Sequence, residues 1–192
     1  IPAGVYSRDG TIIGRIGTIA KTVGWGLYTD PTADTLTAYP QYPVASWLFD
    51  SLTPALEMTE DPTYTIAREP VYATGYNGVY IAGTSAGKLV KAKIAGTDGL
   101  LMPQAPIVDS LFCDDSGIAA RQRALYELSK SGYSETLTIT LPYLTELGIL
   151  KPGQYITVGT ISGLVRKTSV TAEWTKDGAL KIIQTLGLEV RP

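Results

Sequence analysis

The alternation of apolar and hydroxyl side chains in "TLTITLP" (136–142) is the feature that most limits the fold of this chain. Leu137, Ile139 and Leu141 alternate with threonines. Successive side chains of a β-strand point to opposite faces of a sheet. The pattern therefore predicts a strand with one buried apolar face and one face of threonines.

Three more strands are predicted after it. "KPGQYITV" combines a Pro-Gly turn with a short strand. "GLVRKTSVTAEW" and "ALKIIQTLGLEV" are joined by "TKDG", whose Asp-Gly pair favours a hairpin. The side chains that we expect on the inward faces of these two strands are Leu164, Val170, Ala172, Trp174, Leu180, Ile182, Leu186 and Leu188.

Segments earlier in the chain have further residue patterns that predict strands. "GTIIGRIGTIA" (10–20) predicts a strand loosened by glycines, and Asn77-Gly78 predicts a tight hairpin turn. "KLVKAKIAG" (88–96) predicts a half-buried strand with a solvated lysine face. Between them, "VASWLFDSL" has room for about two helical turns, because prolines flank it on both sides.

One helix is predicted at about 116–131, within "DDSGIAARQRALYELSKSG". Asp115 or Ser116 is expected to cap its start, and Gly132 to end it. The side chains expected on its apolar face are Ile118, Ala124, Leu125 and Leu128. Arg121 intrudes near that face. Three roles remain open for it, namely snorkelling toward solvent, pairing with a carboxylate at the edge of the core, or contacting a partner subunit.

These segments predict a mainly β (α+β) fold. Twelve prolines and 20 glycines divide the chain into short pieces. We expect a curled antiparallel sheet or split β-barrel with one packed helix over residues 63–192. Residues 1–62 are expected to be an irregular, strand-containing attachment or a fragment of a neighbouring domain. Because the chain starts with Ile rather than Met, we expect its true N-terminal region to be absent.

The amino-acid composition excludes several classes of function. A net charge of −2 gives no global attraction to nucleic acid, and no apolar run approaches the roughly 18–20 residues that span a bilayer. The chain has no histidine, which removes Ser-His-Asp triads and His-ligated zinc. Its single cysteine, Cys113, is interpreted as a buried structural thiol. We expect no enzymatic activity, no metal and no cofactor.

Several motifs imitate reactive sites. "GTSAG" (83–87) has the letters of a nucleophile elbow, and Ser85 with Lys88 imitates a Ser-Lys pair, but neither has the helix and partners that such chemistry requires. Asp114-Asp115 is interpreted as the start of the helix rather than a metal site. A basic strand surface is conceivable from Lys88, Lys91, Lys93, Arg166 and Lys167. A glycosidase would need two convergent carboxylates, and the acids considered for them are Glu57, Glu60, Asp61 and Glu69.

A series of segments resembles one family. It starts with "YPQYPVASW" and "EPVYATGYNGVYIAG" and continues through "AGTDGLLMPQAPIVDSLFCDDSGIAARQRALYELSKSG". It ends with "TLTITLPYLTELGILKPGQYITV", "SGLVRKTSVTAEW" and "KIIQTLGLEV". In this order the segments resemble the central baseplate or tail-tip hub proteins of bacteriophage tails, over roughly residues 38–192.

The resemblance implies a structural protein of the virion, of which this chain would be the C-terminal portion. Such a hub would join the tail tube to the tip, spike or fibres and surround the DNA exit path. It would form a homo-oligomer, a trimeric ring, and contact tube, distal-tail, tape-measure, spike or fibre proteins, with no specific nucleic acid sequence and no membrane span. The alternative is a β-rich receptor- or carbohydrate-binding tail-tip module, suggested by 12 tyrosines and by Trp25 and Trp47.

Overall fold

The computed structural model describes residues 10–30, 33–59, 65–83, 89–103, 107–108, 117–143, 145 and 148–191. They belong to two compact units, each built from two separate segments. The first unit comprises Ile1–Ser46 and Thr74–Gly132, and the second comprises Trp47–Ala73 and Tyr133–Pro192. Whether residues 1–62 and 63–192 fold as separate domains is a different question from this division into units. The expected boundary between residues 62 and 63 therefore stays a prediction.

The first unit begins with a helix, α1 (Ile12–Thr22), followed by the antiparallel pair β1 (Trp25–Thr29) and β2 (Leu36–Pro40). The strand expected at residues 10–20 is therefore wrong. Thr11 caps α1, because its side chain accepts a hydrogen bond from the Gly14 amide at 3.2 Å. The two glycines have a low helix propensity, but the packing of α1 on β1 outweighs it. Gly17 lies on the packed side, since a Cβ on it would lie 3.7 Å from the Leu27 side chain.

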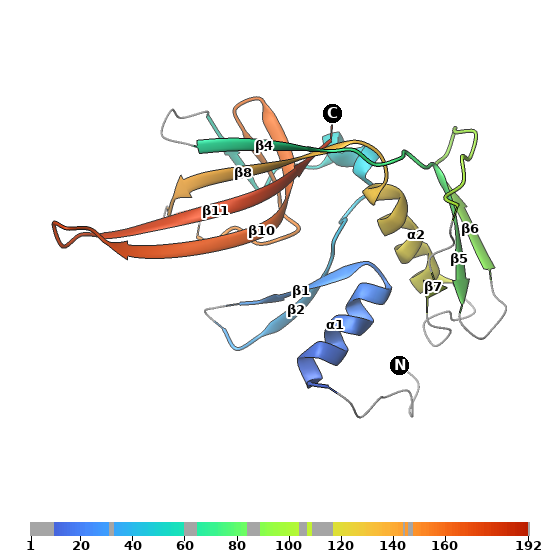
Figure 1. Cartoon of the computed structure of the whole chain (residues 1–192), viewed down its shortest axis with the longest axis horizontal. Coiled ribbons are helices and arrows are strands. Elements are labelled where there is room, and N and C mark those ends of the chain that lie inside the picture. Colours follow the sequence, from blue (N-terminus) through green and yellow to red (C-terminus); the bar gives the residue numbers. More distant parts are fainter. Residues whose placement is uncertain are drawn as a thin grey trace. The chain divides into compact units, whose positions relative to one another are not determined.

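The rest of the first unit is a three-stranded sheet covered by α2 (Ile118–Lys130), as Figure 1 shows. The strand order is β6 (Leu89–Lys93), β5 (Gly78–Gly83), β7 (Ile107–Val108). The buried core between helix and sheet consists of Val79, Ile81, Ala120, Ala124 and Leu128. The predicted strand within 88–96 is confirmed, and Lys91 and Lys93 are exposed on it.

Two details of this unit differ from the sequence predictions. Asn77-Gly78 does not form a hairpin turn, because Gly78 already pairs with Lys93 and the Asn77 amide donates to the Leu100 carbonyl at 3.1 Å. The N-cap of α2 is Gly117, with a left-handed φ of 65° and no side-chain cap hydrogen bond. Asp115 and Ser116, the residues expected to cap the helix, lie outside the described residues.

The predicted end of α2 is confirmed, whereas the prediction of its apolar face is only partly confirmed. Gly132, with φ of 85°, follows the last turn. Ala124 and Leu128 are buried as expected and Leu125 is half-buried, whereas Ile118 is exposed at the first turn. The helix packs on β5 and β6 of its own unit, and Ala120 and Ser129 complete its buried face.

The second unit is a six-stranded, strongly curled half-barrel. Its strand order is β3 (Leu56–Met58), β9 (Tyr155–Val158), β10 (Ile161–Trp174), β11 (Leu180–Val190), β8 (Ser134–Pro142), β4 (Thr65–Val71). All neighbours are antiparallel except β3 and β9. A 3-10 helix, η1 (Ser46–Ser51), takes the place of the predicted two helical turns. The mainly β class with a curled sheet is confirmed.

The alternating pattern of β8 is confirmed, and it forms the centre of the core. Leu137, Ile139 and Leu141 are buried, and their neighbours on β11 are Leu186 and Leu188. The remaining buried members of this cluster are Leu56, Leu150, Ile156, Val158 and Val165. The Pro152-Gly153 turn and the hairpin at "TKDG" are also confirmed, with φ of 91° at Gly153 and 79° at Gly178.

The face predicted for β10 is wrong because of a β-bulge. The register runs from Val165↔Leu188 directly to Lys167↔Gly187, so Arg166 is the extra residue. An extra residue reverses the alternation, and Leu164 therefore faces away from the side that carries Val170, Ala172 and Trp174.

The β10–β11 hairpin extends past its neighbours in the sheet (Figure 1). The β11–β8 register ends at Ile183↔Pro142, whereas the β10–β11 pairing continues to Trp174↔Leu180. Residues 172–182, called the arm below, thus form a two-stranded ribbon. Its Trp174 and Leu180 side chains, expected to be inward, are exposed, because in the described part of the chain no further strand pairs with the ribbon there.

Candidate functional site

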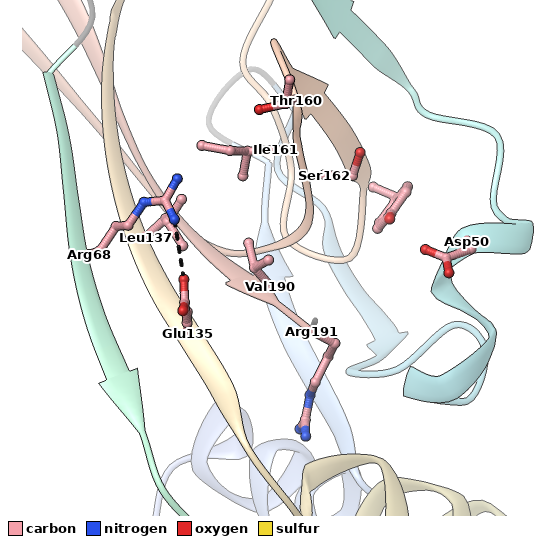
Figure 2. Close-up of a pocket in the computed structure, with 10 residues that line it drawn as sticks. Asp50, Arg68, Glu135, Leu137, Thr160, Ile161, Ser162, Val190 and Arg191 are labelled. Carbon is pink, nitrogen blue, oxygen red and sulfur yellow. Dashed lines mark ion pairs between the residues drawn. The ribbon is translucent and has the colours of Figure 1, made fainter.

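A pocket of about 470 Å³ opens on the half-barrel of the second unit. Its lining side chains come from five strands, from η1 and from the turn before β10. Figure 2 shows Arg68 on one wall, Asp50 on another and the apolar side chains between them. The lining residues are Asp50, Arg68, Glu135, Leu137, Tyr155, Thr160, Ile161, Ser162, Val190 and Arg191.

Glu135 on β8 organises one wall of this pocket. Its carboxylate lies 3.7 Å from the Arg68 guanidinium and accepts a 2.7 Å hydrogen bond from the Tyr133 hydroxyl. That hydrogen bond, with burial adding to it, raises the pKa of Tyr133 to about 12. The Tyr133 ring also contacts Tyr72 at 5.2 Å between centroids. Tyr133 therefore stays protonated and serves as a fixed donor.

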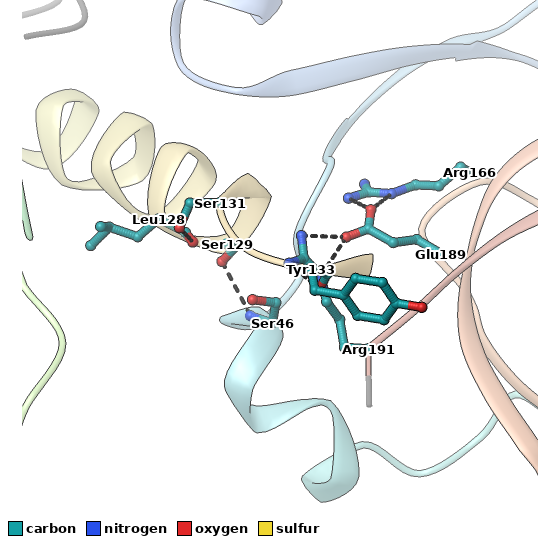
Figure 3. A network of polar contacts seen from close by, with 8 residues as sticks. All are labelled: Ser46, Leu128, Ser129, Ser131, Tyr133, Arg166, Glu189 and Arg191. Atoms are coloured by element: carbon teal, nitrogen blue, oxygen red, sulfur yellow. Dashed lines mark hydrogen bonds and ion pairs between the residues drawn. The ribbon is translucent and has the colours of Figure 1, made fainter. Parts of the chain in front are cut away.

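Arg191, which lines the pocket, belongs to an arginine–glutamate–arginine cluster with Glu189 and Arg166 (Figure 3). The Glu189 carboxylate accepts from Arg166 Nε at 2.7 Å and from Arg191 Nε at 2.9 Å, each on a different oxygen. Arg191 also donates to the Tyr133 carbonyl at 3.2 Å. These three charged side chains are largely withdrawn from solvent, and the cluster ties the end of β11 to β10 and to the start of β8.

Hydroxyl groups line the part of the pocket near β9. Burial raises the pKa of the Tyr155 hydroxyl, and the Tyr155 ring packs against Phe49 with 5.8 Å between centroids. The Ser162 and Thr157 hydroxyls are 2.9 Å apart. A second, more open hollow of about 560 Å³ lies along the edge strand β3, beside Glu57 and Thr157. The hydroxyl groups near β9 provide hydrogen-bonding contacts, and the aromatic rings there provide apolar contacts.

In the first unit, Arg123 is the most connected charged side chain. It pairs with Glu127 at 2.7 Å and donates to the carbonyls of Lys21 and Thr22, at 2.9 Å and 3.0 Å. These carbonyls end α1, so Arg123 supplies a C-terminal cap from another helix. A Cβ on Gly24 would lie only 2.4 Å from Tyr126, which shows how closely the chain after α1 approaches α2.

Arg121, the residue singled out for a partner contact, is exposed on α2. Within the described ranges it makes no ion pair, so pairing at the edge of the core does not occur there. A role in contacting a partner subunit stays a prediction.

The acids considered for glycosidase chemistry do not form a pair in the described part of the chain. Glu57 is on β3 and Glu69 on β4, the two opposite edge strands of the sheet. Among the described residues, no group of three His, Cys, Asp or Glu side chains could hold a metal ion. The other candidates lie outside those residues, namely Glu60, Asp61, Ser85, Lys88, Cys113, Asp114 and Asp115.

The basic residues considered as one strand surface belong to different units. Lys91 and Lys93 are on β6, and Lys91 lies over the Tyr80 ring at 5.5 Å. Arg166 is on β10, where Glu189 neutralises it. Helices in the described ranges are too short or too polar to cross a bilayer.

The sequence reasoning missed Glu135, Glu189, Arg191 and Arg123. The charge alternation in "LEVR" (188–191) is a signal that could have indicated Glu189 and Arg191, since a charged pair next to buried leucines often marks a sheet end. The contacts of Glu135 with Arg68 and of Arg123 with the Lys21 carbonyl gave no such signal, because these partners are distant in sequence.

Comparison with known proteins relates this chain to tail proteins by structure alone. No family model matches the sequence, and no curated protein matches it. The crystal structure of a tail protein from Neisseria meningitidis MC58 superposes with a TM-score of 0.54 at 17% identity, over 96% of this chain and 56% of that chain. A 43 kDa tail protein of prophage MuSo2 from Shewanella oneidensis gives a TM-score of 0.47 at 11% identity, over 95% and 54%. The chain thus spans just over half the length of either protein, and 96% of it shares the fold of part of the Neisseria tail protein.

Proposed function

We propose that the chain is a structural component of a bacteriophage tail, located in the virion as a baseplate or tail-tip hub. The observation that carries this proposal is the match to the Neisseria tail protein over 96% of this chain. The resemblance of residues 38–192 to hub proteins is independent support, because it rests on sequence segments rather than on the fold. The hub joins the tail tube to the tip, spike or fibres, as a trimeric ring around the DNA exit path.

A role without catalysis agrees with the chemistry of the pocket. Of the carboxylates that line it, Glu135 is engaged by Arg68 and Tyr133, and the chain has no histidine to serve as a base.

The test is the location of the protein in particles. Purified tails are analysed by mass spectrometry, and an antibody against the chain is localised by immunogold electron microscopy. We expect the protein in tails, with gold at the end distal to the head. Its absence from virions, or label along the whole tube, would refute the hub proposal.

A receptor- or carbohydrate-binding module is the second candidate, favoured by exposed aromatic side chains. Tyr72, Trp47 and Trp174 are exposed, and aromatic faces stack on sugar rings. Trp25, by contrast, has a buried indole nitrogen. Glycan-array binding that disappears in Tyr72→Ala or Trp47→Ala, with the fold intact, would favour this candidate over the hub.

A further inference from the structure

We infer that the pocket of the second unit binds a basic side chain, lysine or arginine, of a neighbouring tail protein. This inference deepens the proposed function, on which it rests for the source of that side chain, because it names the chemistry of the partner. All residues that line the pocket belong to the second unit, so the site is described within one compact unit.

Asp50 supplies the charge that the pocket leaves without a partner. Two carboxylates line the pocket, and that of Glu135 already contacts the Arg68 guanidinium and the Tyr133 hydroxyl. Asp50 is exposed, and within the described ranges it makes no ion pair or hydrogen bond. Its charge reaches into the pocket, since it adds to the effect of burial in raising the pKa of the Tyr155 hydroxyl. A cation that enters the pocket therefore finds one open carboxylate, that of Asp50.

The other charges around the pocket direct a cation to the same wall. Arg191 shares the Glu189 carboxylate with Arg166, so this cluster keeps one excess positive charge. Figure 2 shows Asp50 on the wall opposite Arg68, which is itself a cation. An entering cation is repelled by these arginines and attracted by Asp50. The seat of the positive group is therefore the Asp50 wall.

The floor between the two walls suits the stem of a long side chain. Leu137 is fully buried, and Ile161 and Val190 are half-buried and pack against the core. Lysine and arginine lay their methylene stems on apolar surface while the charged head stays in a polar environment. The hydroxyls of Thr160 and Ser162 line the same pocket and offer acceptor oxygens to that head. The volume of about 470 Å³ lies within the roughly 300–1,000 Å³ of ligand pockets.

The same lining disfavours a sugar. Among the described residues that line the pocket, Tyr155 is the aromatic one, and its ring is buried against Phe49 with 5.8 Å between centroids. The lining therefore offers no open aromatic face for stacking on a sugar ring. A basic side chain needs no such face, because its contacts are an apolar floor and a carboxylate.

NMR titration of the purified, isotope-labelled protein with blocked tripeptides tests this assignment. The probes are Ala-Lys-Ala, Ala-Gln-Ala and Ala-Glu-Ala, acetylated and amidated, with glucose as the sugar probe. Each is added to about 20 mM, so that a Kd in the millimolar range is measured. Asp50→Lys reverses the charge of the wall. Glu173→Lys, on the exposed arm and outside the pocket, makes the same change of charge and is the matched control.

We expect Ala-Lys-Ala to bind about three- to fivefold more tightly than Ala-Gln-Ala, with shifts confined to the amides of Asp50 and residues 160–162. Asp50→Lys should reverse the preference in favour of Ala-Glu-Ala, whereas Glu173→Lys should leave it unchanged. The amide spectrum of each variant away from its substitution confirms the fold.

Equal affinities of the three peptides, no shift at these amides, or a lysine preference that survives Asp50→Lys would overturn the inference. Tighter binding of glucose at the same amides would overturn it as well, in favour of a sugar site. A tail location without peptide binding refutes this site alone. Peptide binding by a protein that is absent from virions refutes the hub instead.

Discussion

Arg166 on β10 donates from Nε to the Glu189 carboxylate on β11 at 2.7 Å, although the register pairs Glu189 with Leu164. Arg166 is two residues after Leu164 and is the extra residue of the β-bulge, so it has no direct partner of its own on β11. Arg191 occupies the other oxygen of the same carboxylate. One acidic side chain therefore holds two arginines at the end of the half-barrel.

Replacing this carboxylate should destabilise the second unit strongly. Glu189→Gln leaves two largely buried guanidinium groups without a counter-ion, and we expect a loss of about 2–4 kcal/mol in the free energy of unfolding. Urea unfolding followed by circular dichroism measures it. Glu173→Gln, on the exposed arm, is the matched control and should change stability by less than about 0.5 kcal/mol. Equal effects of the two variants would show that the cluster contributes nothing.

Stability at alkaline pH should depend on Tyr133. The hydrogen bond to Glu135 raises the pKa of Tyr133 to about 12, above its usual value of 10.0. The unfolded chain therefore loses this proton first, so the stabilisation is complete below pH 10 and declines between about pH 10 and 12. Tyr133→Phe should flatten the decline, as measured by urea unfolding at a series of pH values. Phenolate absorbance should show one fewer late-titrating tyrosine in the variant. An unchanged titration would contradict the assignment.

Removing the Arg123 side chain should loosen α1. Arg123→Ala takes the donors from the Lys21 and Thr22 carbonyls, and hydrogen bonds from a charged donor contribute about 1.5–3 kcal/mol. We expect amide hydrogen exchange in α1 to accelerate about tenfold or more. Arg121→Ala, on the same helix but exposed, is the control and should leave α1 exchange unchanged. Acceleration in both variants would point to a general weakening of α2 instead.

Two glycine substitutions should act in opposite directions. A Cβ at position 163 would lie 2.9 Å from Val190 and 3.0 Å from the Glu189 carbonyl, so Gly163→Ala should cost about 1–3 kcal/mol. Gly17→Ala meets only an ordinary 3.7 Å contact with Leu27 inside a helix, and it should add about 0.5–1 kcal/mol. Thermal unfolding of both variants is the measurement. A destabilising Gly17→Ala would mean that α1 approaches β1 more closely than described.

The periodicity of the sequence was sufficient to predict which side chains are buried at the centre of the half-barrel. Leu137, Ile139 and Leu141 are buried as their alternation predicts, because a strand's side-chain period of two depends only on local backbone geometry. The turn at Pro152-Gly153 and the end of α2 at Gly132 follow from equally local preferences. The absence of histidine excluded whole classes of catalysis without any structure.

Tertiary structure decided the rest. The bulge at Arg166 moved Leu164 to the other face, and the length of the arm left Trp174 exposed, since alternation cannot report where a neighbouring strand stops. Residues 10–20 became a helix because packing on β1 compensates for two glycines. The pocket combines Arg68 on β4, Glu135 on β8 and Arg191 directly after β11, which are distant in sequence. Local sequence determined which strands form, whereas long-range pairing decided which side chains meet, because that depends on register and strand order.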